Sequence, residues 1–219
     1  MKNYHASLEK CPLFKGIKAE DISKMLVCLD ARVKRYDKNQ FIFTEGDTPE
    51  YVGIVLSGEV RIIKEDYYGR VSLVANIPSG GLFAEAFACA GIGALPVSAE
   101  ASSESEIMLI DVKRIIGSCS NACVFHASLI NNLLRVMAEK NILLNRKIEF
   151  TSKRTTKDKL MSYLLAEAKE AQGSTFSIPL DRKQLADYLG VERSAMSAEL
   201  GKLKRDGKID FKKNCFRIL

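Results

Sequence analysis

With 219 residues, 47% of them hydrophobic and 27% charged, the chain is long enough for one or two domains with buried cores. No apolar run approaches the ~20 residues of a membrane span, and the first residues lack the apolar stretch of a secretory signal, so we expect a cytoplasmic protein with no membrane partner. The net charge is +6, and six cysteines without a C-x-x-C pair, beside only two histidines, exclude a zinc finger.

The positive charge is concentrated in the last third of the chain. Residues 1–150 hold 18 of the 33 basic and 18 of the 27 acidic residues and are neutral overall, which leaves 15 basic and 9 acidic residues in 151–219. A basic domain joined to a neutral one indicates nucleic acid as the partner of the basic part.

Residues 31–112 predict an antiparallel β domain. Short β-rich runs such as "SGEVRII" and "VSLVANI" are separated by Gly, Asp, Asn and Pro turns. Many short strands with glycine turns favour a barrel or a sandwich over a parallel sheet.

Residues 121–149 contain no Pro or Gly and predict one long helix. With Ala127 at heptad position a, the a and d positions are apolar except for Asn141, and a lone Asn at a favours a two-stranded parallel pair. We therefore predict a homodimer. Its seam consists of Ala127, Ile130, Leu134, Met137, Asn141, Leu144 and Ile148. A second stripe is expected to pack on the β domain: Leu129, Leu133, Val136 and Leu143.

Beyond the polar, basic stretch "TSKRTTKDK", residues 181–211 predict a winged helix-turn-helix. Asp181 is the expected N-cap of the first helix, and the small Ala186 permits a close crossing of the two helices. Gly190 makes the turn between them, and Gly207 ends the second helix before a β wing. A motif of this kind binds double-stranded DNA.

The exposed face of the second helix is expected to enter the major groove. Arg193 lies at its N-terminal end, where a guanidinium can hold a guanine edge, a contact typically worth ~1–3 kcal/mol of discrimination. Other cations are better placed for phosphates, and phosphate contacts make binding sensitive to salt. The predicted DNA-binding residues are Arg182, Lys183, Arg193, Ser194, Ser197 and Lys202, with Lys204, Arg205, Lys212 and Lys213 as further phosphate candidates.

In this order of elements, the chain resembles the Crp/Fnr superfamily of bacterial transcription regulators. The resemblance is carried by "VLSGEVRII", "GGLFAEAF" and "ESEIMLID" in the first part and by "RKQLADYLGVERSAMSAELGKL" in the last. It implies an α+β fold with an N-terminal double-stranded β-helix, a jelly roll of the cyclic-nucleotide-binding kind (1–118), a long dimerisation helix (119–150) and a C-terminal winged helix-turn-helix (151–219). It also implies a homodimer on a palindromic operator, a signal that reorients the DNA-binding domains, and RNA polymerase as a partner.

The resemblance also implies roles for residues of the second helix of the motif. Arg193 matches the family's first base-contacting Arg, and Ser197 matches a serine used by the anaerobic branch. Ser194 stands where most members have an acidic residue, and Ala198 replaces a later Arg, so the preferred half-site is expected to differ from the usual one.

In the cyclic-nucleotide members, a Gly-Glu pair binds the ribose and an Arg-Ser pair holds the phosphate. Counting back from "IMLID", these pairs fall on Ala84 and Glu85 and on Leu95 and Pro96. Residues 71–112 hold no Lys, Arg or His to pair with a buried phosphate. We therefore expect a signal other than cyclic AMP, and the cofactor is unknown. The candidate effector-binding residues are Glu85, Leu95, Pro96, Asn141, Leu144 and Asn145.

Alternatives remain open for the signal and for the function. "CSNACVFH" brings Cys119, Cys123 and His126 within two helical turns, so a redox contact or a metal site is a second kind of input. A cupin-like metal-binding enzyme would need clustered histidines, and no catalytic motif is evident, so we expect no enzyme and assign no metal ligands. A module that binds protein instead of DNA is the third class, and the basic last third argues against it.

Overall fold

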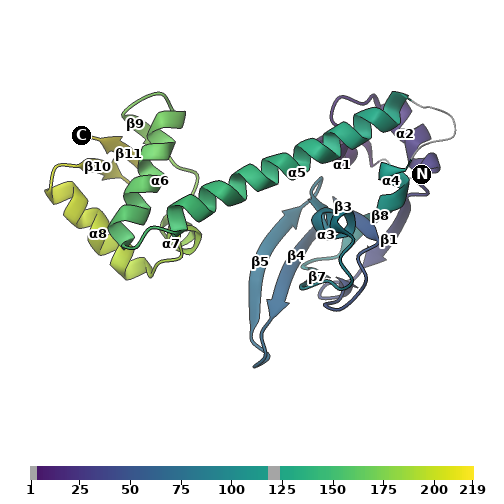
Figure 1. The fold of residues 1–219 in the computed structure, drawn as a ribbon, viewed down its shortest axis with the longest axis horizontal. Coiled ribbons are helices and arrows are strands. Elements are labelled where there is room, and N and C mark those ends of the chain that lie inside the picture. Colours follow the sequence, from purple (N-terminus) through teal and green to yellow (C-terminus); the bar gives the residue numbers. More distant parts are fainter. Residues whose placement is uncertain (1–3, 118–123) are drawn as a thin grey trace. The chain divides into compact units, whose positions relative to one another are not determined.

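The computed structural model describes residues 4–117 and 124–219 of the chain (Figure 1). They fold into two compact units, Met1–Ala138 and Glu139–Leu219, and the long helix α5 (Val124–Thr151) has residues in both. The first unit contains the β domain and the second contains the helix-turn-helix, which confirms the predicted α+β class and the order of its parts. None of the described helices has the length and apolar character needed to cross a membrane.

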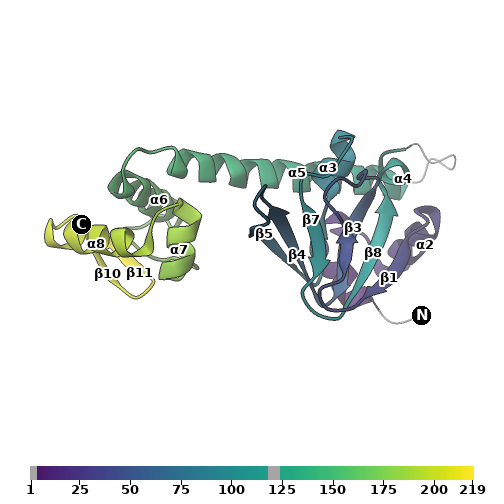
Figure 2. The same cartoon turned by 90° about the horizontal axis from the view of Figure 1, so that it is seen from below.

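Two four-stranded antiparallel sheets make up the β domain, as expected for a jelly roll. Their strand orders are β1-β8-β3-β6 and β2-β7-β4-β5, so most neighbours in space are distant in sequence. Figure 2 shows β7, β4 and β5 side by side, and β1, β8 and β3 likewise. The strands are β1 (Arg32–Tyr36), β2 (Phe41–Phe43), β3 (Tyr51–Ser57), β4 (Glu59–Glu65), β5 (Val71–Pro78), β6 (Leu82–Phe83), β7 (Ser98–Ala101) and β8 (Ser105–Asp111).

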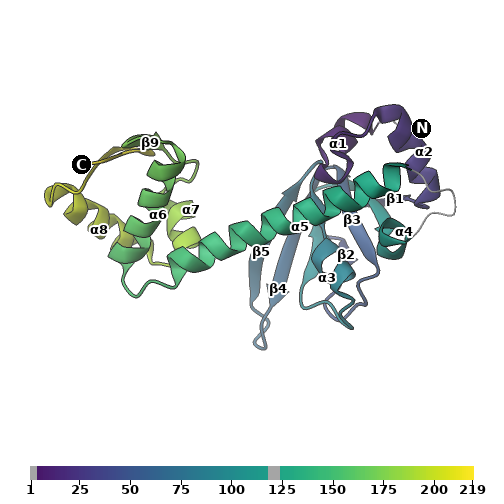
Figure 3. The same ribbon diagram turned by 45° about the horizontal axis from the view of Figure 1, so that its top comes forward.

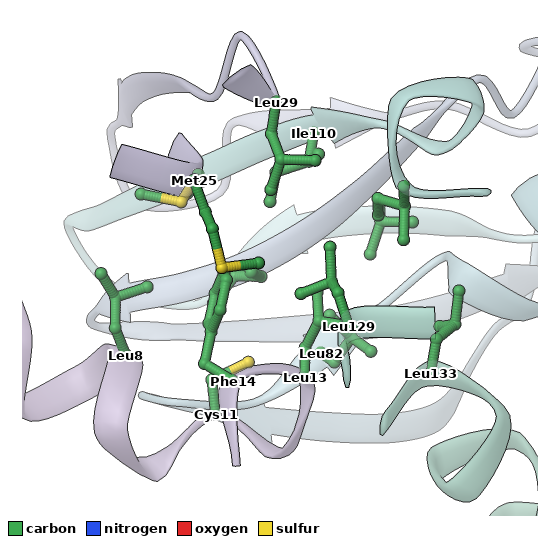
Figure 4. Close-up of a cluster of buried hydrophobic side chains, with 14 of the residues drawn as sticks. Leu8, Cys11, Leu13, Phe14, Met25, Leu29, Leu82, Ile110, Leu129 and Leu133 are labelled. Carbon is green, nitrogen blue, oxygen red and sulfur yellow. The ribbon is translucent and has the colours of Figure 1, made fainter. Parts of the chain in front are cut away.

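A hydrophobic core of the first unit joins the β domain to the helices around it (Figures 3 and 4). The helices that contribute are α1 (His5–Lys10), the 3₁₀ turn η1 (Pro12–Phe14), α2 (Ala19–Cys28), α3 (Glu85–Ala90), α4 (Val112–Ile116) and the first half of α5. The buried Asn132 of α5 donates from Nδ2 to the carbonyl oxygens of Leu13 (3.0 Å) and Lys15 (2.8 Å). These bonds satisfy a polar group that would otherwise be costly to bury.

The second hydrophobic stripe of the long helix was predicted correctly for three of its four residues. Leu129, Leu133 and Val136 are buried in the core of the first unit. The prediction for Leu143 is wrong, because this side chain is 60% exposed. Leu143 lies beyond Ala138, where the first unit ends, so the β domain's core does not extend to it.

The second unit is a winged helix-turn-helix. Its elements are α6 (Thr156–Glu170), β9 (Thr175–Ser177), α7 (Arg182–Leu189), α8 (Arg193–Arg205), β10 (Ile209–Lys212) and β11 (Cys215–Ile218). One core of this unit buries the apolar residues of α7 and α8: Leu185, Ala186, Leu189, Met196, Leu200 and Leu203. The strands form a small antiparallel sheet of order β10-β11-β9, in which β10 and β11 are the wing.

The last turns of α5 pack into the core of the second unit. The ring of Phe150 lies 5.6 Å from that of Tyr163 and 6.4 Å from that of Tyr188, measured between centroids. Arg146 pairs with Glu170 of α6, with 2.7 Å between Nη2 and Oε2. The end of α5 is therefore anchored to the helix-turn-helix by packing as well as by the chain.

Helix α3 (Glu85–Ala90) of the first unit begins after a strained residue. Its N-cap, Ala84, has φ 63° and ψ −2°, a left-handed conformation in which the Cβ of an L-residue crowds the backbone. Glycine adopts this conformation without that crowding. The turn at Ala84 leads into Glu85, whose side chain is 2% exposed.

We expect Ala84→Gly to raise the free energy of unfolding by about 0.5–1 kcal/mol, because relief of the left-handed strain outweighs the extra entropy of an unfolded glycine. Urea unfolding of the full-length protein measures the change. Ala86→Gly, within the same helix, is the matched control and should lower the same free energy by about 0.5–1 kcal/mol. Equal destabilisation by both substitutions would show that Ala84 is not strained.

Candidate functional site

The first helix of the motif, α7, is fixed at both ends by local hydrogen bonds. Asp181 accepts from the backbone N–H of Gln184 (2.8 Å), and the Gln184 side chain accepts from the N–H of Asp181 (2.9 Å), which completes a capping box. At the other end Gly190 has φ 59°, the left-handed conformation that a helix C-terminus favours. The predicted roles of Asp181 as the N-cap and of Gly190 as the turn residue are both confirmed.

The second helix, α8, begins at a carboxylate cap. Glu192 accepts from the N–H of Ala195 (2.8 Å) and from the hydroxyl of Ser194. The hydrogen bond from the Ser194 side chain is the main cause that lowers the pKa of the Glu192 carboxyl below its usual value, and the backbone N–H groups add to it. A charged cap at this position also interacts favourably with the helix dipole.

Two of the predicted DNA-binding residues use their hydroxyls within α8. Ser194 donates to Glu192, and Ser197 donates to the carbonyl oxygen of Arg193 (2.9 Å). Both side chains are exposed on the helix, so their oxygens still face solvent as acceptors. Lys202, another predicted DNA-binding residue on this helix, pairs with Glu199, with 2.6 Å between Nζ and Oε1.

A hollow of about 660 Å³ lies where the starts of α7 and α8 meet the wing. We call it the wing hollow, and its lining residues are Asp181, Arg182, Lys183, Arg193, Lys213 and Asn214. It brings together three of the six predicted DNA-binding residues, Arg182, Lys183 and Arg193. Ser194, Ser197 and Lys202 do not line it. Asn214 was missed, because only the wing's tertiary position brings the "KN" turn of residues 213–214 to this place.

Arg182 is held by the wing rather than extended into solvent. The carbon centre of its guanidinium lies 4.8 Å from the ring centroid of Phe211 and 5.0 Å from that of Phe216. Its Nη2 donates to the carbonyl oxygen of Lys213 at 2.8 Å. Burial lowers the pKa of this guanidinium relative to an exposed arginine.

Two of the predicted effector residues of the first unit, Leu95 and Pro96, form an uncharged turn that we call the Leu95 corner. The Leu95 side chain is 4% exposed. Its N–H donates to the carbonyl of Asp47 (2.9 Å), and its own carbonyl accepts from the N–H of Gly46 (2.9 Å). The neighbouring Pro96 is exposed and has no N–H to donate. Neither residue supplies a charge or an open donor for a phosphate.

Arg61, a strand cation of the β domain, does not supply the charge that Leu95 lacks. Arg61 of β4 lies opposite Glu100 of β7, next to the buried pair Val60 and Ala101. Because side chains alternate along a strand, Arg61 faces away from the interior. Its Nη2 lies 2.7 Å from Oε1 of Glu100, so its charge is already paired.

The remaining candidates fall in other parts of the chain. Asn141, Leu144 and Asn145 are exposed on the part of α5 that belongs to the second unit, and Asn145 donates to Asn141 at 2.7 Å. Cys119 and Cys123 lie outside the described residues. Nε2 of the buried His126 lies 2.8 Å from the carbonyl oxygen of Arg114, and the described residues contain no cluster of three or more His, Cys, Asp or Glu that could hold a metal ion.

Comparison with known proteins identifies both parts of the chain. The family model of the cyclic nucleotide-binding domain matches residues 33–121, and the model of the Crp-like helix-turn-helix domain matches residues 158–219. The cyclic AMP receptor protein of Thermus thermophilus is 24% identical over 199 residues, which are 90% of this chain and 88% of that protein.

Solved structures share the fold. The catabolite activator protein of Thermus thermophilus has a TM-score of 0.57 at 21% identity, with 95% of this chain and 93% of that chain covered. The c-di-GMP-responsive global regulator CLP of Xanthomonas campestris has a TM-score of 0.54 at 21% identity, with 92% of this chain and 99% of that chain covered. With both of its domains matched in the same order, the chain belongs to the Crp/Fnr superfamily of transcription regulators.

Proposed function

We propose that this regulator is a homodimer that binds a palindromic DNA operator through α8 and responds to a small-molecule or redox signal other than cyclic AMP. The observation that carries the DNA-binding part is the wing hollow, where Lys183, Arg193 and Lys213 gather beside the exposed start of α8. This hollow belongs to the unit in which all the excess positive charge is found. The superfamily consists of transcription regulators, which argues against a catalytic role.

Within this proposal the cations divide between two tasks. Arg193, exposed at the first position of α8, reads a base edge in the major groove. Lys183 and Lys213 flank it and contact phosphates, which orient the protein without reading sequence. Ser194 and Ser197 accept hydrogen bonds from bases or lie against the backbone, and Lys202 contacts a phosphate if its pair with Glu199 opens.

We expect Arg193→Ala to lower the affinity for a selected operator by about 1–3 kcal/mol and to relax its preference at one base pair. Lys183→Gln should weaken operator and arbitrary duplex alike and reduce the slope of log K against log salt by about one. Fluorescence anisotropy on a duplex selected from a random pool measures both effects. Lys169→Gln on α6, an exposed cation that does not line the hollow, is the control. Salt-independent binding by the wild-type protein would count against DNA as the partner.

The proposed dimer seam follows from exposed apolar residues on α5. Leu134, Leu144 and Ile148 are each at least 60% exposed, and they occupy heptad positions of the predicted seam. Ala127 and Asn141 are also exposed, whereas Ile130 and Met137 are half-buried. A row of exposed aliphatic side chains at this spacing is typical of a helix that pairs with another copy.

We expect Leu144→Glu to convert the protein from dimer to monomer, because two carboxylates would face each other in an apolar seam. Sedimentation velocity over a range of concentrations measures the change. Leu165→Glu on α6 is the matched control, because Leu165 is 49% exposed and lies outside the seam, and it should leave the dimer intact. A wild-type protein that sediments as a monomer at all concentrations would overturn the seam.

The proposed signal follows from the chemistry of the Leu95 corner. A cyclic nucleotide brings a phosphate monoanion, and a buried anion needs a cation or several hydrogen bonds. Leu95 is buried with both backbone groups used, Pro96 has no N–H, and Arg61 is paired on the outer face. Glu85 remains as a polar group for the effector, with Asn141, Leu144 and Asn145 of α5 as further candidates. These features favour a neutral or apolar ligand.

We expect isothermal titration of the full-length protein with cyclic AMP to show no saturable binding, because Leu95 and Pro96 offer the phosphate neither a cation nor an open N–H, and Arg61 is paired with Glu100. Saturable binding of cyclic AMP would contradict the proposal.

Protein purified without oxygen also distinguishes a ligand from a redox input. A colourless sample with a bound neutral molecule in native mass spectrometry supports the ligand, whereas visible absorbance or iron moves the input to Cys119, Cys123 and His126.

The finer parts of the proposal follow from family membership. The boundaries 1–118, 119–150 and 151–219 separate a signal-binding domain, a dimerisation helix and a DNA-binding domain. RNA polymerase is the expected partner at the promoter, and the cytoplasm is where such a regulator meets its operator.

A further inference from the structure

The wing turn is held in place from the body of the second unit. Residues Lys213 and Asn214 connect β10 to β11, and each of their carbonyl oxygens has a partner elsewhere. The Lys213 carbonyl accepts from Nη2 of Arg182 at 2.8 Å, and the Asn214 carbonyl accepts from the N–H of Ile178 at 3.0 Å. Arg182 and Ile178 thus hold the turn by hydrogen bonds to its two carbonyl oxygens.

The turn needs such support because it is strained. Lys213 has φ 54°, in the left-handed region where residues with a Cβ are disfavoured. A conformation of this kind persists where its surroundings fix it, and such residues concentrate at binding sites. The hydrogen bond from Arg182 reaches the carbonyl of this same residue, so it acts on the backbone that carries the Lys213 side chain.

Arg182 is also poorly placed to contact DNA itself. Its guanidinium lies against the rings of Phe211 and Phe216, and Nη2 is used by Lys213. Its Nη1 is buried and has no hydrogen-bond partner in the described residues, so a phosphate oxygen cannot reach it without moving the wing. A planar group that stacks on two rings and donates along its edge is well suited to positioning.

We propose that Arg182 is a positioning residue, which holds the wing turn so that Lys213 lines the hollow and contacts a DNA phosphate, and that it is not itself a phosphate contact. This inference rests on the proposed DNA-binding function. It changes the role of Arg182 from the one that its charge and sequence position suggest.

Four variants of the full-length protein separate positioning from direct contact. Arg182→Lys keeps the charge but loses the planar stack, and Arg182→Gln loses both. Lys213→Asn removes the cation, while asparagine still tolerates the left-handed turn. Phe211→Leu removes a stacking ring and no charge. Each is titrated with a short duplex of arbitrary sequence over a series of salt concentrations, below its own unfolding temperature, with Lys169→Gln as control.

If Arg182 positions the wing, Arg182→Lys behaves like Arg182→Gln and like Lys213→Asn. Each loses about one phosphate contact, which lowers the salt slope by about 0.9 and the affinity about eightfold at ~0.1 M salt. The double variant of Arg182→Gln with Lys213→Asn is no weaker than either single variant, because the same contact is lost. Phe211→Leu lowers the slope in the same direction although it changes no charge.

A direct phosphate contact gives the opposite pattern. Arg182→Lys then binds DNA nearly as well as the wild type, and the double variant loses about two phosphate contacts. Phe211→Leu leaves the salt slope unchanged. Any of these results overturns the inference. Lower thermal stability with an unchanged salt slope also overturns it, because the role would then be structural only. Absence of salt-dependent duplex binding by the wild type would instead remove the proposed function.

Discussion

Helix α5 contributes buried residues to two separate cores, one in each unit. Both units therefore depend on this one helix for part of their packing. Near its start, Leu129, Leu133 and Val136 are buried in the first unit, and burying such side chains is worth roughly 1.5–3 kcal/mol each. At its end, Phe150 is buried among the rings of the second unit. Neither unit can release the helix without exposing apolar surface to water.

Between these two attachments, most of the described residues of α5 are exposed. All of residues 138–145 are exposed, including Ile142, Leu143 and Leu144, each 60% exposed. A helix that is apolar on more than one side is normally buried. The seam positions account for Leu144, while Ile142 and Leu143 lie outside the a and d positions. A partner that covers this stretch would therefore contact a helix whose two ends belong to different cores.

The sequence predicted best those features that depend on local chemistry. Asp181 caps α7, Gly190 ends it, and Ala186 is buried at the crossing, because each of these roles is decided within a few residues. Strand partners were not predictable in the same way. Strand β1 pairs with β8, from Arg32 opposite Leu109 to Tyr36 opposite Ser105, and closing such a long loop depends on the whole core.

The candidate DNA-binding residues also show that roles set by tertiary contacts cannot be predicted from local sequence. A charge pattern predicts that Arg182 and Lys183 have similar roles, because they are adjacent cations at a helix start. Phe211 and Phe216, far along the chain, take up the guanidinium of Arg182, whereas Lys183 stays exposed. Tertiary neighbours thus decide which cation is available to a partner, and the sequence alone gives only the total charge.

The candidate effector residues of the first unit combine a strained backbone turn with an uncharged side chain. Ala84 keeps the left-handed turn that glycine would make without strain, and the turn leads directly into the buried Glu85. At Leu95 the backbone is fully paired, while the side chain offers only apolar surface. The entry to α3 is therefore made at an energetic cost, and Leu95 offers no cation to a phosphate. An effector that binds beside Leu95 would be recognised there by shape, apolar contact and hydrogen bonding, because Leu95 and Pro96 carry no charge.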